Sequence, residues 1–383
     1  MFGPQSLCGL VIALMRIQRL QLTSLRSIAH LSLDASPDIN IIHGPNGSGK
    51  TSVLEAIHLL SLGRSFRTHQ ARHVISEGQT EATSFAQLID QLGTSAGGLG
   101  VSRSTQGELR ARYQARDIDI AGLASLLPVQ VIDSDSFGLL DGSPAVRRQF
   151  ADWGGFHHSE RFISVWRGFQ RALKQRNSLL KYAKIDRSLL EVWNREFLSY
   201  SEQLTELRLA YIESLRPQFE EILNLLVNDL SLEFSYSRGW DKERSLADVL
   251  DEGIDRDQRQ GFTGAGPQRA DLRFKVAGRN AAEHLSRGQK KLVVSALKLA
   301  QGRVYNDISG SSCIYLIDDL PAELDAGHLD KFCTYLKASN SQCFITCVDP
   351  ELLVRLWGSS EQGRLFQLTD GKLTAIKPFG DSE

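Results

Sequence analysis

The segment Gly-Pro-Asn-Gly-Ser-Gly-Lys-Thr at residues 44–51 constrains the fold of this chain more than any other feature. It matches the phosphate-loop pattern G-x-x-x-x-G-K-[ST], which requires a strand before it and a helix after it. Residues 39–43 are apolar enough for a buried strand, and residues 51–62 place apolar side chains at helical spacing with no Pro or Gly before Gly63. A glycine turn that fits by chance is disfavoured, because both flanks also match. The sequence therefore predicts an α/β fold built around a phosphate-binding loop.

This loop predicts a site for ATP and Mg²⁺. Small residues let the main chain approach the phosphates, and the partly positive N-terminus of the helix favours an anion there. We expect the Lys50 ammonium to reach the β- and γ-phosphate oxygens and the Thr51 hydroxyl to occupy one Mg²⁺ position. The predicted nucleotide contacts in the loop are Gly44, Pro45, Asn46, Gly47, Ser48, Gly49, Lys50 and Thr51.

Two carboxylates follow a second predicted strand. Residues 314–317 are apolar and lead into Asp318 and Asp319, a pattern that is similar to a Walker B segment. We expect Asp318 to hold Mg²⁺ through water and Asp319 to orient the water that attacks the γ-phosphate. Many ATPases of this class have Glu at the second position, and Asp is one methylene shorter, so slow hydrolysis is expected. A strand-end cap with no catalytic part is the alternative for Asp319.

A third motif, Leu-Ser-Arg-Gly-Gln-Lys, precedes an apolar helix. Taken alone, it indicates an N-cap at Ser286 with Gln289 at the third helical position. Together with the two motifs above, it resembles the LSxGQ signature of ABC-type ATPases, in which the signature of one subunit covers the γ-phosphate bound by another. That resemblance implies a homodimer, with Ser286, Gly288 and Gln289 as nucleotide contacts. Asp325 lies in a segment similar to the D-loop of the same class and is expected to contact the opposite subunit.

The chain has 383 residues, with 44 Lys and Arg against 45 Asp and Glu, and a net charge of −1. This length predicts two or three cores, and the charge balance excludes a globally basic nucleic-acid coat but not a local basic face. Helical spacing begins near residue 144, and strand character returns after Gly261, followed by a helix predicted at residues 286–301. The predicted fold is an ABC-type ATPase head, a mixed sheet flanked by helices, with an inserted helical arm lobe. Its expected parts are a possible non-native extension at residues 1–14, the head at 15–143 and 261–383, and the arm lobe at 144–260.

The cysteines and the apolar N-terminal stretch bear on the location of the protein. The five cysteines form no CxxC pair, which favours a reducing compartment and a cytoplasmic protein. Cys343 and Cys347 lie four residues apart, but the run between them resembles a buried strand and lacks a nearby His, so zinc is disfavoured. The longest apolar stretch, residues 7–15, is shorter than the ~20 residues that span a bilayer, and no Lys or Arg precedes it as in a signal peptide. Strand alternation begins only after Met15, so we hypothesise that translation starts there.

Three stretches carry a more specific resemblance. They are Gly-Arg-Ser-Phe-Arg at residues 63–67, Leu-Lys-Gln-Arg-Asn at residues 173–177 and Gly-Pro-Gln-Arg-Ala-Asp-Leu at residues 266–272. With them, the chain from about residue 15 to near its C-terminus resembles the RecF family of bacterial DNA repair and replication proteins. Members of that family usually have His where Gln268 stands, and often Ser-Pro-Glu where residues 133–135 are Asp-Ser-Asp, which leaves the roles of these two sites open.

The resemblance implies a function. It implies recognition of single-stranded or gapped DNA, cooperation with RecR and RecO in loading recombinase, and a role in replication restart and the SOS response. With the motifs, it implies a switch in which ATP draws two subunits together on one DNA and a weak, DNA-stimulated ATPase activity releases it.

A basic helix is the predicted DNA contact. Residues 161–187 hold eight Arg or Lys and one acid. Three of the cations, at 167, 171 and 174, share a helical face while aromatic residues line the other, so the charges can follow phosphates. A solvated polar face on a core helix is the alternative. Arginines near residue 65, outside this helix, are expected to extend the basic surface. The predicted DNA contacts, which fix position and do not read sequence, are Arg64, Arg67, Arg167, Arg171, Lys174 and Arg176.

Three other classes of protein share some of these motifs. A transporter-type ABC ATPase subunit should lack a large helical insertion, and the spacing from Thr51 to Ser286 is about twice what such a subunit needs. An SMC-like chromosome-organising ATPase needs a coiled coil of hundreds of residues, more than the predicted lobe holds. The sequence does not exclude a third alternative, a nucleotide-gated binding module with negligible ATP turnover.

Overall fold

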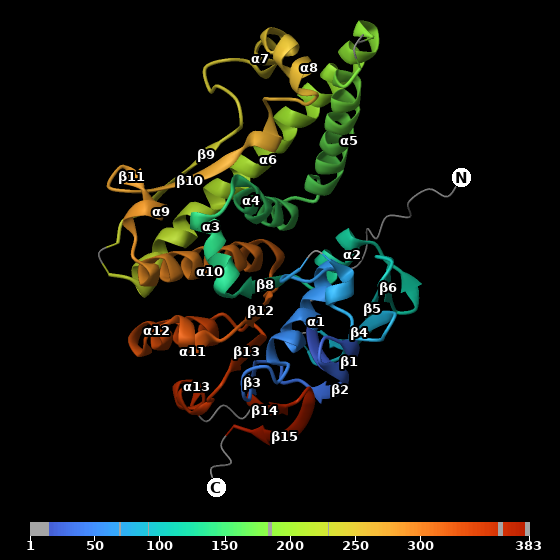
Figure 1. Cartoon of the computed structure of the whole chain (residues 1–383). Coiled ribbons are helices and arrows are strands. Elements are labelled where there is room, and N and C mark those ends of the chain that lie inside the picture. The colour runs from blue at the N-terminus through green and yellow to red at the C-terminus, as the bar shows by residue number, and fades with distance from the viewer. Residues whose placement is uncertain are drawn as a thin grey trace. The chain divides into compact units, whose positions relative to one another are not determined.

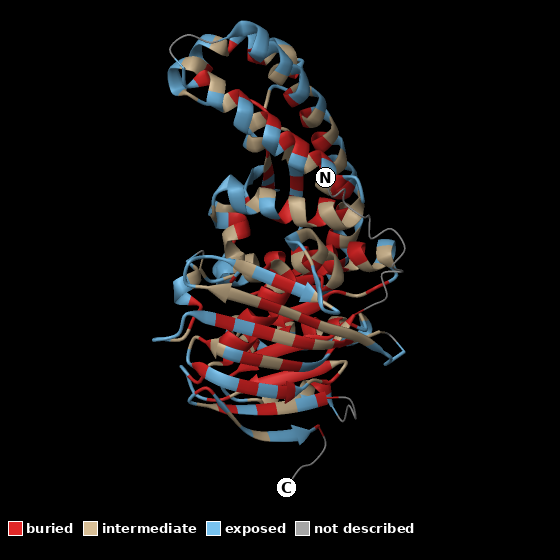
Figure 2. Cartoon of the chain, turned by 90° about the vertical axis from the view of Figure 1, so that its right-hand side faces the viewer, coloured by how far each residue is buried: buried red, intermediate tan, exposed pale blue. Residues whose placement is uncertain are grey.

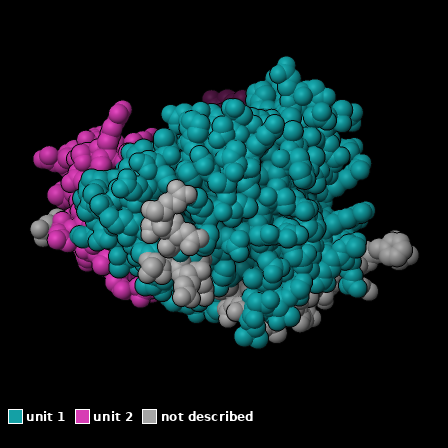
Figure 3. All heavy atoms as spheres, turned by 90° about the horizontal axis from the view of Figure 1, so that it is seen from below, with its two compact units in different colours: residues 1–136, 305–383 teal, residues 137–304 magenta. Residues whose placement is uncertain are grey.

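The computed structural model describes residues 15–68, 70–90, 92–182, 186–228, 230–358 and 363–379. The chain divides into two compact units, coloured separately in Figure 3: residues 1–136 with 305–383, and residues 137–304. The second unit begins close to the predicted lobe boundary at residue 144, but it ends at residue 304 and not at 260. Two kinds of contact explain the difference. β10 (Asp271–Val276) pairs antiparallel with β9 (Glu233–Ser237), and the Gln301 amide donates to the Phe150 carbonyl oxygen and the Tyr211 hydroxyl of the helical unit. The possible extension at residues 1–14 lies outside the described residues.

The first unit contains a six-stranded sheet in the order β15-β14-β3-β13-β12-β8. Its strands are β3 (Ile39–His43), β8 (Val129–Ile132), β12 (Ile314–Ile317), β13 (Cys343–Cys347), β14 (Gly363–Thr369) and β15 (Lys372–Pro378). All pairs are parallel except β14 with β15. Every residue of β12 and β13 is buried, as expected of parallel strands covered on both faces. The carboxyl ends of β3, β12 and β13 therefore meet at one edge, which is where α/β sheets bind ligands.

A second sheet in the same unit is antiparallel, in the order β2-β1-β4-β5-β6-β7. Its strands are β1 (Arg16–Leu25), β2 (Ile28–Asp34), β4 (Glu81–Ile89), β5 (Ser95–Ser104), β6 (Leu109–Tyr113) and β7 (Arg116–Asp117). Figure 2 shows buried and exposed residues alternating along these strands, as expected of a sheet with one solvated face. Strands β4 to β7 thus form successive antiparallel hairpins.

Helix α1 (Lys50–Leu62) follows β3 and contacts strands of both sheets (Figure 1). Its side chains Val53, Ile57 and Leu60 are wholly buried in one core with β1 and β4. The first residue of this helix is thereby fixed at the carboxyl edge of β3. The other short helices of the unit are η1 (Ala71–His73), α2 (Ile120–Leu126), α11 (Leu320–Glu323), α12 (Ala326–Ala338) and α13 (Glu351–Trp357), and η2 (Ser134–Phe137) lies at its boundary.

The second unit is mainly helical. Helices α5 (Phe162–Leu180) and α6 (Arg187–Leu226) pack against each other, with the Phe169 and Phe197 rings 5.6 Å apart between centroids. The remaining elements are α3 (Gly138–Asp141), α4 (Pro144–His158), α7 (Leu246–Glu252), α8 (Ile254–Gln260), η3 (Pro267–Arg269), β11 (Arg279–Asn280), α9 (Ala281–His284) and α10 (Arg287–Ser309). Among the described residues, no helix is long and apolar enough to cross a membrane.

Candidate nucleotide site and basic surfaces

The loop at residues 44–49 joins β3 to α1 in a conformation that two glycines make possible. Gly44 has φ 149°, and a methyl group there would lie 2.1 Å from the carbonyl oxygen of Leu368. Gly49 has φ 101° and caps the N-terminus of α1, and the first turn of that helix carries no acid. A left-handed glycine directly before Lys50 leaves the backbone N–H groups at the helix start open to an anion.

The loop holds two polar side chains at this helix start. The Lys50 ammonium donates to the carbonyl oxygens of Gly44 at 2.8 Å and Pro45 at 3.0 Å, and only 8% of the residue is exposed. The buried Ser48 hydroxyl has no hydrogen-bond partner among the residues that the structure describes. A buried hydroxyl in that state costs free energy, so a bound phosphate fits this loop.

An oxygen cluster lies beside the loop, at the carboxyl edge of the sheet. The Thr51 hydroxyl donates to both carboxylate oxygens of Asp318 at 3.0 Å. The Thr346 hydroxyl, at the end of β13, donates to Asp318 Oδ1 at 2.6 Å. The structure thus brings together the two residues predicted to serve Mg²⁺. The donor set consists of oxygen atoms only and holds one carboxylate, which fits a Mg²⁺ ion that keeps several waters and phosphate oxygens as its other ligands.

Asp319 follows in a left-handed conformation, φ 52°, and its backbone N–H donates to the Thr346 hydroxyl at 2.8 Å. Burial raises the pKa of the Asp319 carboxyl above its usual value, and the neighbouring Asp318 carboxylate raises it further. A carboxyl with a raised pKa accepts a proton more readily, as a general base near a γ-phosphate must.

Thr346 was not among the predicted site residues. The sequence signal was weak, because Thr is a common residue in strands, and only its place at the end of a strand next to β12 distinguishes it. Cys347 follows it, and burial raises the pKa of this thiol to about 12, so the thiol is neutral at physiological pH.

The signature segment forms a capping box in the second unit. The Gln289 backbone N–H donates to the Ser286 hydroxyl at 3.2 Å, and the Ser286 N–H donates to the Gln289 side-chain oxygen at 3.0 Å. The predicted cap is therefore confirmed. Ser286 and Gly288 are exposed, so this helix start presents its N–H groups and a hydroxyl at the surface of the unit.

Asp325 caps α12 in the first unit. Its carboxylate accepts from the N–H groups of Gly327 at 3.1 Å and His328 at 3.2 Å, and it contacts His328 Nδ1 at 2.5 Å. The hydrogen bond from His328 holds the pKa of Asp325 below its usual range. Asp325 is exposed, as a residue that meets another subunit must be.

The stretch at residues 63–67 is a loop fastened to α1. The wholly buried Glu55 carboxylate accepts from Arg26 at 2.7 and 2.8 Å and also from the Ser65 hydroxyl. The Ser65 hydroxyl in turn accepts from the Arg67 N–H at 2.9 Å. Arg64 and Arg67 are exposed, so a buried network holds two surface cations in place.

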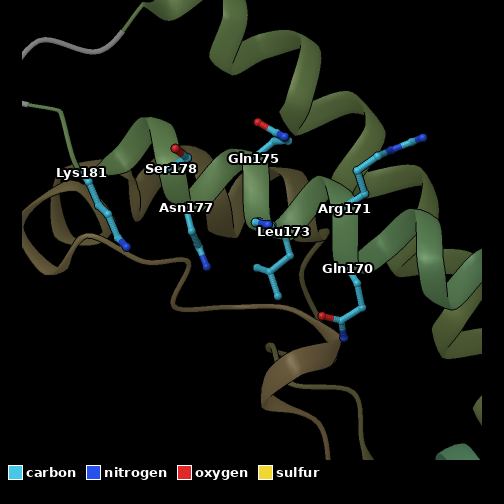
Figure 4. A pocket seen from close by; sticks show the side chains of 8 residues that line it. Gln170, Arg171, Leu173, Gln175, Asn177, Ser178 and Lys181 are labelled. Atoms are coloured by element: carbon cyan, nitrogen blue, oxygen red, sulfur yellow. The ribbon is translucent and has the colours of Figure 1, made fainter. Parts of the chain in front are cut away.

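Along α5, three of the four predicted DNA contacts are exposed. Arg167, Arg171 and Lys174 lie at the surface, and Arg171 forms an ion pair with Glu196 at 3.9 Å. Figure 4 shows the Arg171 side chain on this helix. A row of cations on an exposed helix fits the electrostatic part of DNA binding.

The fourth predicted contact, Arg176, is wrong. Its side chain is 0% exposed, and it donates to Asp257 at 2.9 Å, to the Thr263 hydroxyl at 2.6 Å and to the Asn194 side chain at 2.8 Å. Helical spacing places Arg176 on the opposite side of α5 from Lys174, where it faces α6 and α8. Arg176 is a buried structural residue that cannot reach a phosphate.

The stretch at residues 266–272 is also structural. Arg147 of α4 pairs with Asp271 at 2.6 Å, and Arg208 of α6 donates to the Pro267 carbonyl at 2.9 Å. The Gln268 amide donates to the carbonyl oxygens of Thr263 at 3.2 Å and Ala265 at 3.0 Å. Gln268 therefore ties together the main chain of its own loop. Asp133, at the other departure, accepts from the N–H of Ser136 at 2.8 Å and closes a turn.

Comparison with known proteins agrees with this geometry. Residues 16–369 match the RecF/RecN/SMC N-terminal domain. The chain is 47% identical over 367 residues to the DNA replication and repair protein RecF of Pseudomonas paraeruginosa, covering 96% of this chain and 99% of that protein. The chain belongs to the RecF family. The RecF of a Marinomonas species is 46% identical over 363 residues, covering 94% and 98%. Membership at this level favours RecF over the transporter-type and SMC-like alternatives.

Solved structures share the fold of this RecF-family chain. The recombination mediator protein RecF with ATP, in the RecFOR pathway, has a TM-score of 0.83 at 21% identity, covering 96% of this chain and 98% of that one. An Smc head domain with an extended coiled coil from Pyrococcus furiosus has a TM-score of 0.56 at 17% identity, covering 95% and 96%. The predicted ABC-type ATPase head, a mixed sheet flanked by helices, is confirmed.

Proposed function

We propose that this chain is an ATP-dependent DNA-binding protein of recombinational repair and replication restart. One observation carries the proposal: the Thr51 hydroxyl and the Asp318 carboxylate, far apart in sequence, meet beside the phosphate loop. That arrangement is the one a nucleotide with Mg²⁺ requires, and the names of the RecF relatives supply the biological setting.

Nucleotide binding rests on the first unit. The N–H groups of residues 46–51 and the Lys50 ammonium bind the phosphates, and Lys50 exchanges its carbonyl partners for phosphate oxygens. Thr51 and Asp318 hold Mg²⁺, which neutralises charge on the phosphates when bound. A Lys50→Ala variant is expected to lose ATP binding.

Hydrolysis is expected to be slow and to serve as a switch. Asp319 orients water and accepts its proton, and its raised pKa supports that role. Its side chain is shorter than the Glu common at this position, so the carboxylate holds water less closely to the γ-phosphate. The same feature favours the second candidate, a nucleotide-gated binding module with negligible turnover.

The exposed motifs favour a homodimer. Ser286 with its capping box and Asp325 with its helix cap are both at the surface and already ordered, which lowers the entropy lost when a second subunit covers the nucleotide. In this proposal, ATP brings together two chains whose basic helices then hold single-stranded or gapped DNA. RecR and RecO are the implied partners, in a cytoplasmic pathway that also leads to SOS induction.

The deciding experiment is the sedimentation mass of the protein with ATP and Mg²⁺, with and without a gapped oligonucleotide, against nucleotide-free protein. The expected result is a monomer that becomes a dimer with ATP and retains the DNA. A protein that stays monomeric at saturating ATP, yet binds DNA, would remove the two-subunit mechanism. Phosphate release measured on the same samples separates a slow ATPase from a module without turnover.

A further inference from the structure

A hollow of about 780 Å³ lies along α5, in the second unit. One stripe of this helix, at the spacing that places side chains on a common face, supplies Gln170, Lys174, Asn177 and Lys181 to its lining. Figure 4 shows Gln170, Leu173, Asn177 and Lys181 pointing to the same side of the helix. None of the described lining residues is acidic, so the hollow combines positive charge, amide groups and one apolar side chain.

The loop after α8 borders this hollow. The Thr263 N–H and hydroxyl both donate to the Asn177 side-chain oxygen, at 2.8 and 2.6 Å. A methyl group at Gly261 would lie 3.5 Å from Cγ of Lys181. Phe262 stands between these two contact residues and is 39% exposed. An aromatic residue is therefore held at the surface beside the lining.

A cation stacks on that ring. The Arg269 guanidinium lies 5.2 Å from the centroid of the Phe262 ring, and Arg269 is exposed. The loop between the two residues is fixed from inside, because Thr263 is bound to the buried Arg176 and the Gln268 amide ties together two carbonyl groups of the loop. The stacked pair is thus presented in a set position at the surface.

We propose that this place is a subsite for one unstacked nucleotide of single-stranded DNA. The base stacks on the exposed side of the Phe262–Arg269 pair, as bases do on aromatic and guanidinium groups in single-strand sites. Lys174 and Lys181 contact the phosphates on either side of that base. A base within a duplex has both faces covered by its neighbours, so the stacked pair selects single strands. This inference rests on the proposed function and names the part of the DNA that the arm holds.

The experiment compares three probes by fluorescence anisotropy, with full-length protein, ATP and Mg²⁺ at fixed salt: a thymidine oligonucleotide, the same backbone with abasic sites, and a duplex. Phe262→Ala should weaken binding of the thymidine probe about tenfold, the factor that corresponds to about 1.4 kcal/mol of stacking. It should leave binding of the abasic probe and the duplex unchanged. Phe262→Tyr, which keeps the ring, should bind like the parent, whereas Phe262→Leu should behave like Phe262→Ala.

Salt dependence tests the cations. Lys174→Ala and Lys181→Ala should each reduce the slope of log affinity against log salt by about 0.7, the value for one phosphate contact on a single strand. Lys242→Ala is the matched control, because that lysine is exposed to 88% and pairs with Glu243 in a different loop; its slope should equal that of the parent.

Failure of this inference differs from failure of the proposed function. If the parent binds thymidine and abasic probes equally, or if Phe262→Ala binds both like the parent, the stacking subsite is wrong while DNA binding stands. A fourth probe, a uridine oligonucleotide, tests the assignment to DNA: tighter binding of it than of the thymidine oligonucleotide would overturn that assignment. If the parent binds none of the probes with ATP, the proposed function itself is wrong.

Discussion

Thr346 donates a hydrogen bond from its hydroxyl to the Asp318 carboxylate at 2.6 Å and accepts one from the backbone N–H of the next residue, Asp319, at 2.8 Å. One hydroxyl on β13 thereby fixes both acidic residues that end β12. It orients the carboxylate expected to hold Mg²⁺, and it anchors the left-handed turn that carries the expected base. We therefore expect Thr346 to act as a positioning residue for the candidate nucleotide site.

A Thr346→Val variant tests this role. Valine matches threonine in shape but has no hydroxyl, so Asp318 loses a donor and the Asp319 N–H loses its acceptor. Loss of such an outer partner typically weakens metal affinity or activity by about 10- to 100-fold. We expect that loss in the Mg²⁺ dependence of ATP binding, measured by titration with a fluorescent ATP analogue. Thr346→Ser should recover most of it, and a valine variant with the parental Mg²⁺ dependence would exclude the role.

Asp319→Asn should change the pH dependence of stability in a defined direction. Burial and Asp318 raise the pKa of Asp319 in the folded chain, so ionisation of this carboxyl destabilises the folded state. The stability that the neutral carboxyl contributes is fully present below its ordinary pKa. It is lost as the pH rises through the raised pKa of the folded state. Asn stays neutral and tolerates the left-handed turn. The nucleotide-free variant should therefore melt above the parent at neutral pH, with the gap closing below the ordinary carboxyl pKa. An equal gap at every pH would point to another cause.

The Asp319→Asn variant should still bind ATP but hydrolyse it more slowly, because the binding groups are intact and the expected base is gone. The ATP-bound dimer should therefore accumulate. Phosphate release and sedimentation on the same preparation are the measurements. Hydrolysis at the parental rate would mean that Asp319 only ends the strand.

The central elements could be predicted because local patterns specify them. The β3 strand was predicted with the observed bounds, residues 39–43, and helix α1 within one residue of its start, since glycines and an apolar run mark both. Thr346 and Arg176 could not be placed in the same way. What each does depends on which strand or helix lies beside it. Helical spacing places Arg176 on the face of Phe169, but only the helix that supplies Asp257 shows that the charge is buried and paired there.

Replacing the buried Arg176 should lower the stability of the protein without removing a charge that contacts DNA. Its side chain and that of Asp257 are 0% and 2% exposed, and removing one partner of such a pair costs about 3–5 kcal/mol because the other charge is left buried. Burial lowers the pKa of Arg176 despite this pairing. Arg176→Ala should reduce the free energy of unfolding of the protein in urea by that amount. Lys174→Ala, two residues away on the exposed side of α5, is the matched control and should unfold like the parent.

Reversing two exposed charges on α5 tests whether this helix meets DNA. Arg171→Glu combined with Lys174→Glu replaces two cations by two anions, so binding should weaken by more than tenfold and its salt dependence should flatten, because fewer counterions are released. Arg171 also pairs with Glu196 at 3.9 Å, an exposed contact worth about 0–1 kcal/mol, so the fold should tolerate the change. Circular dichroism and ATP binding equal to those of the parent would establish that the variant is folded. Unchanged DNA affinity in such a folded variant would move the contact away from α5 and toward the exposed Arg64 and Arg67 of the loop fastened to α1.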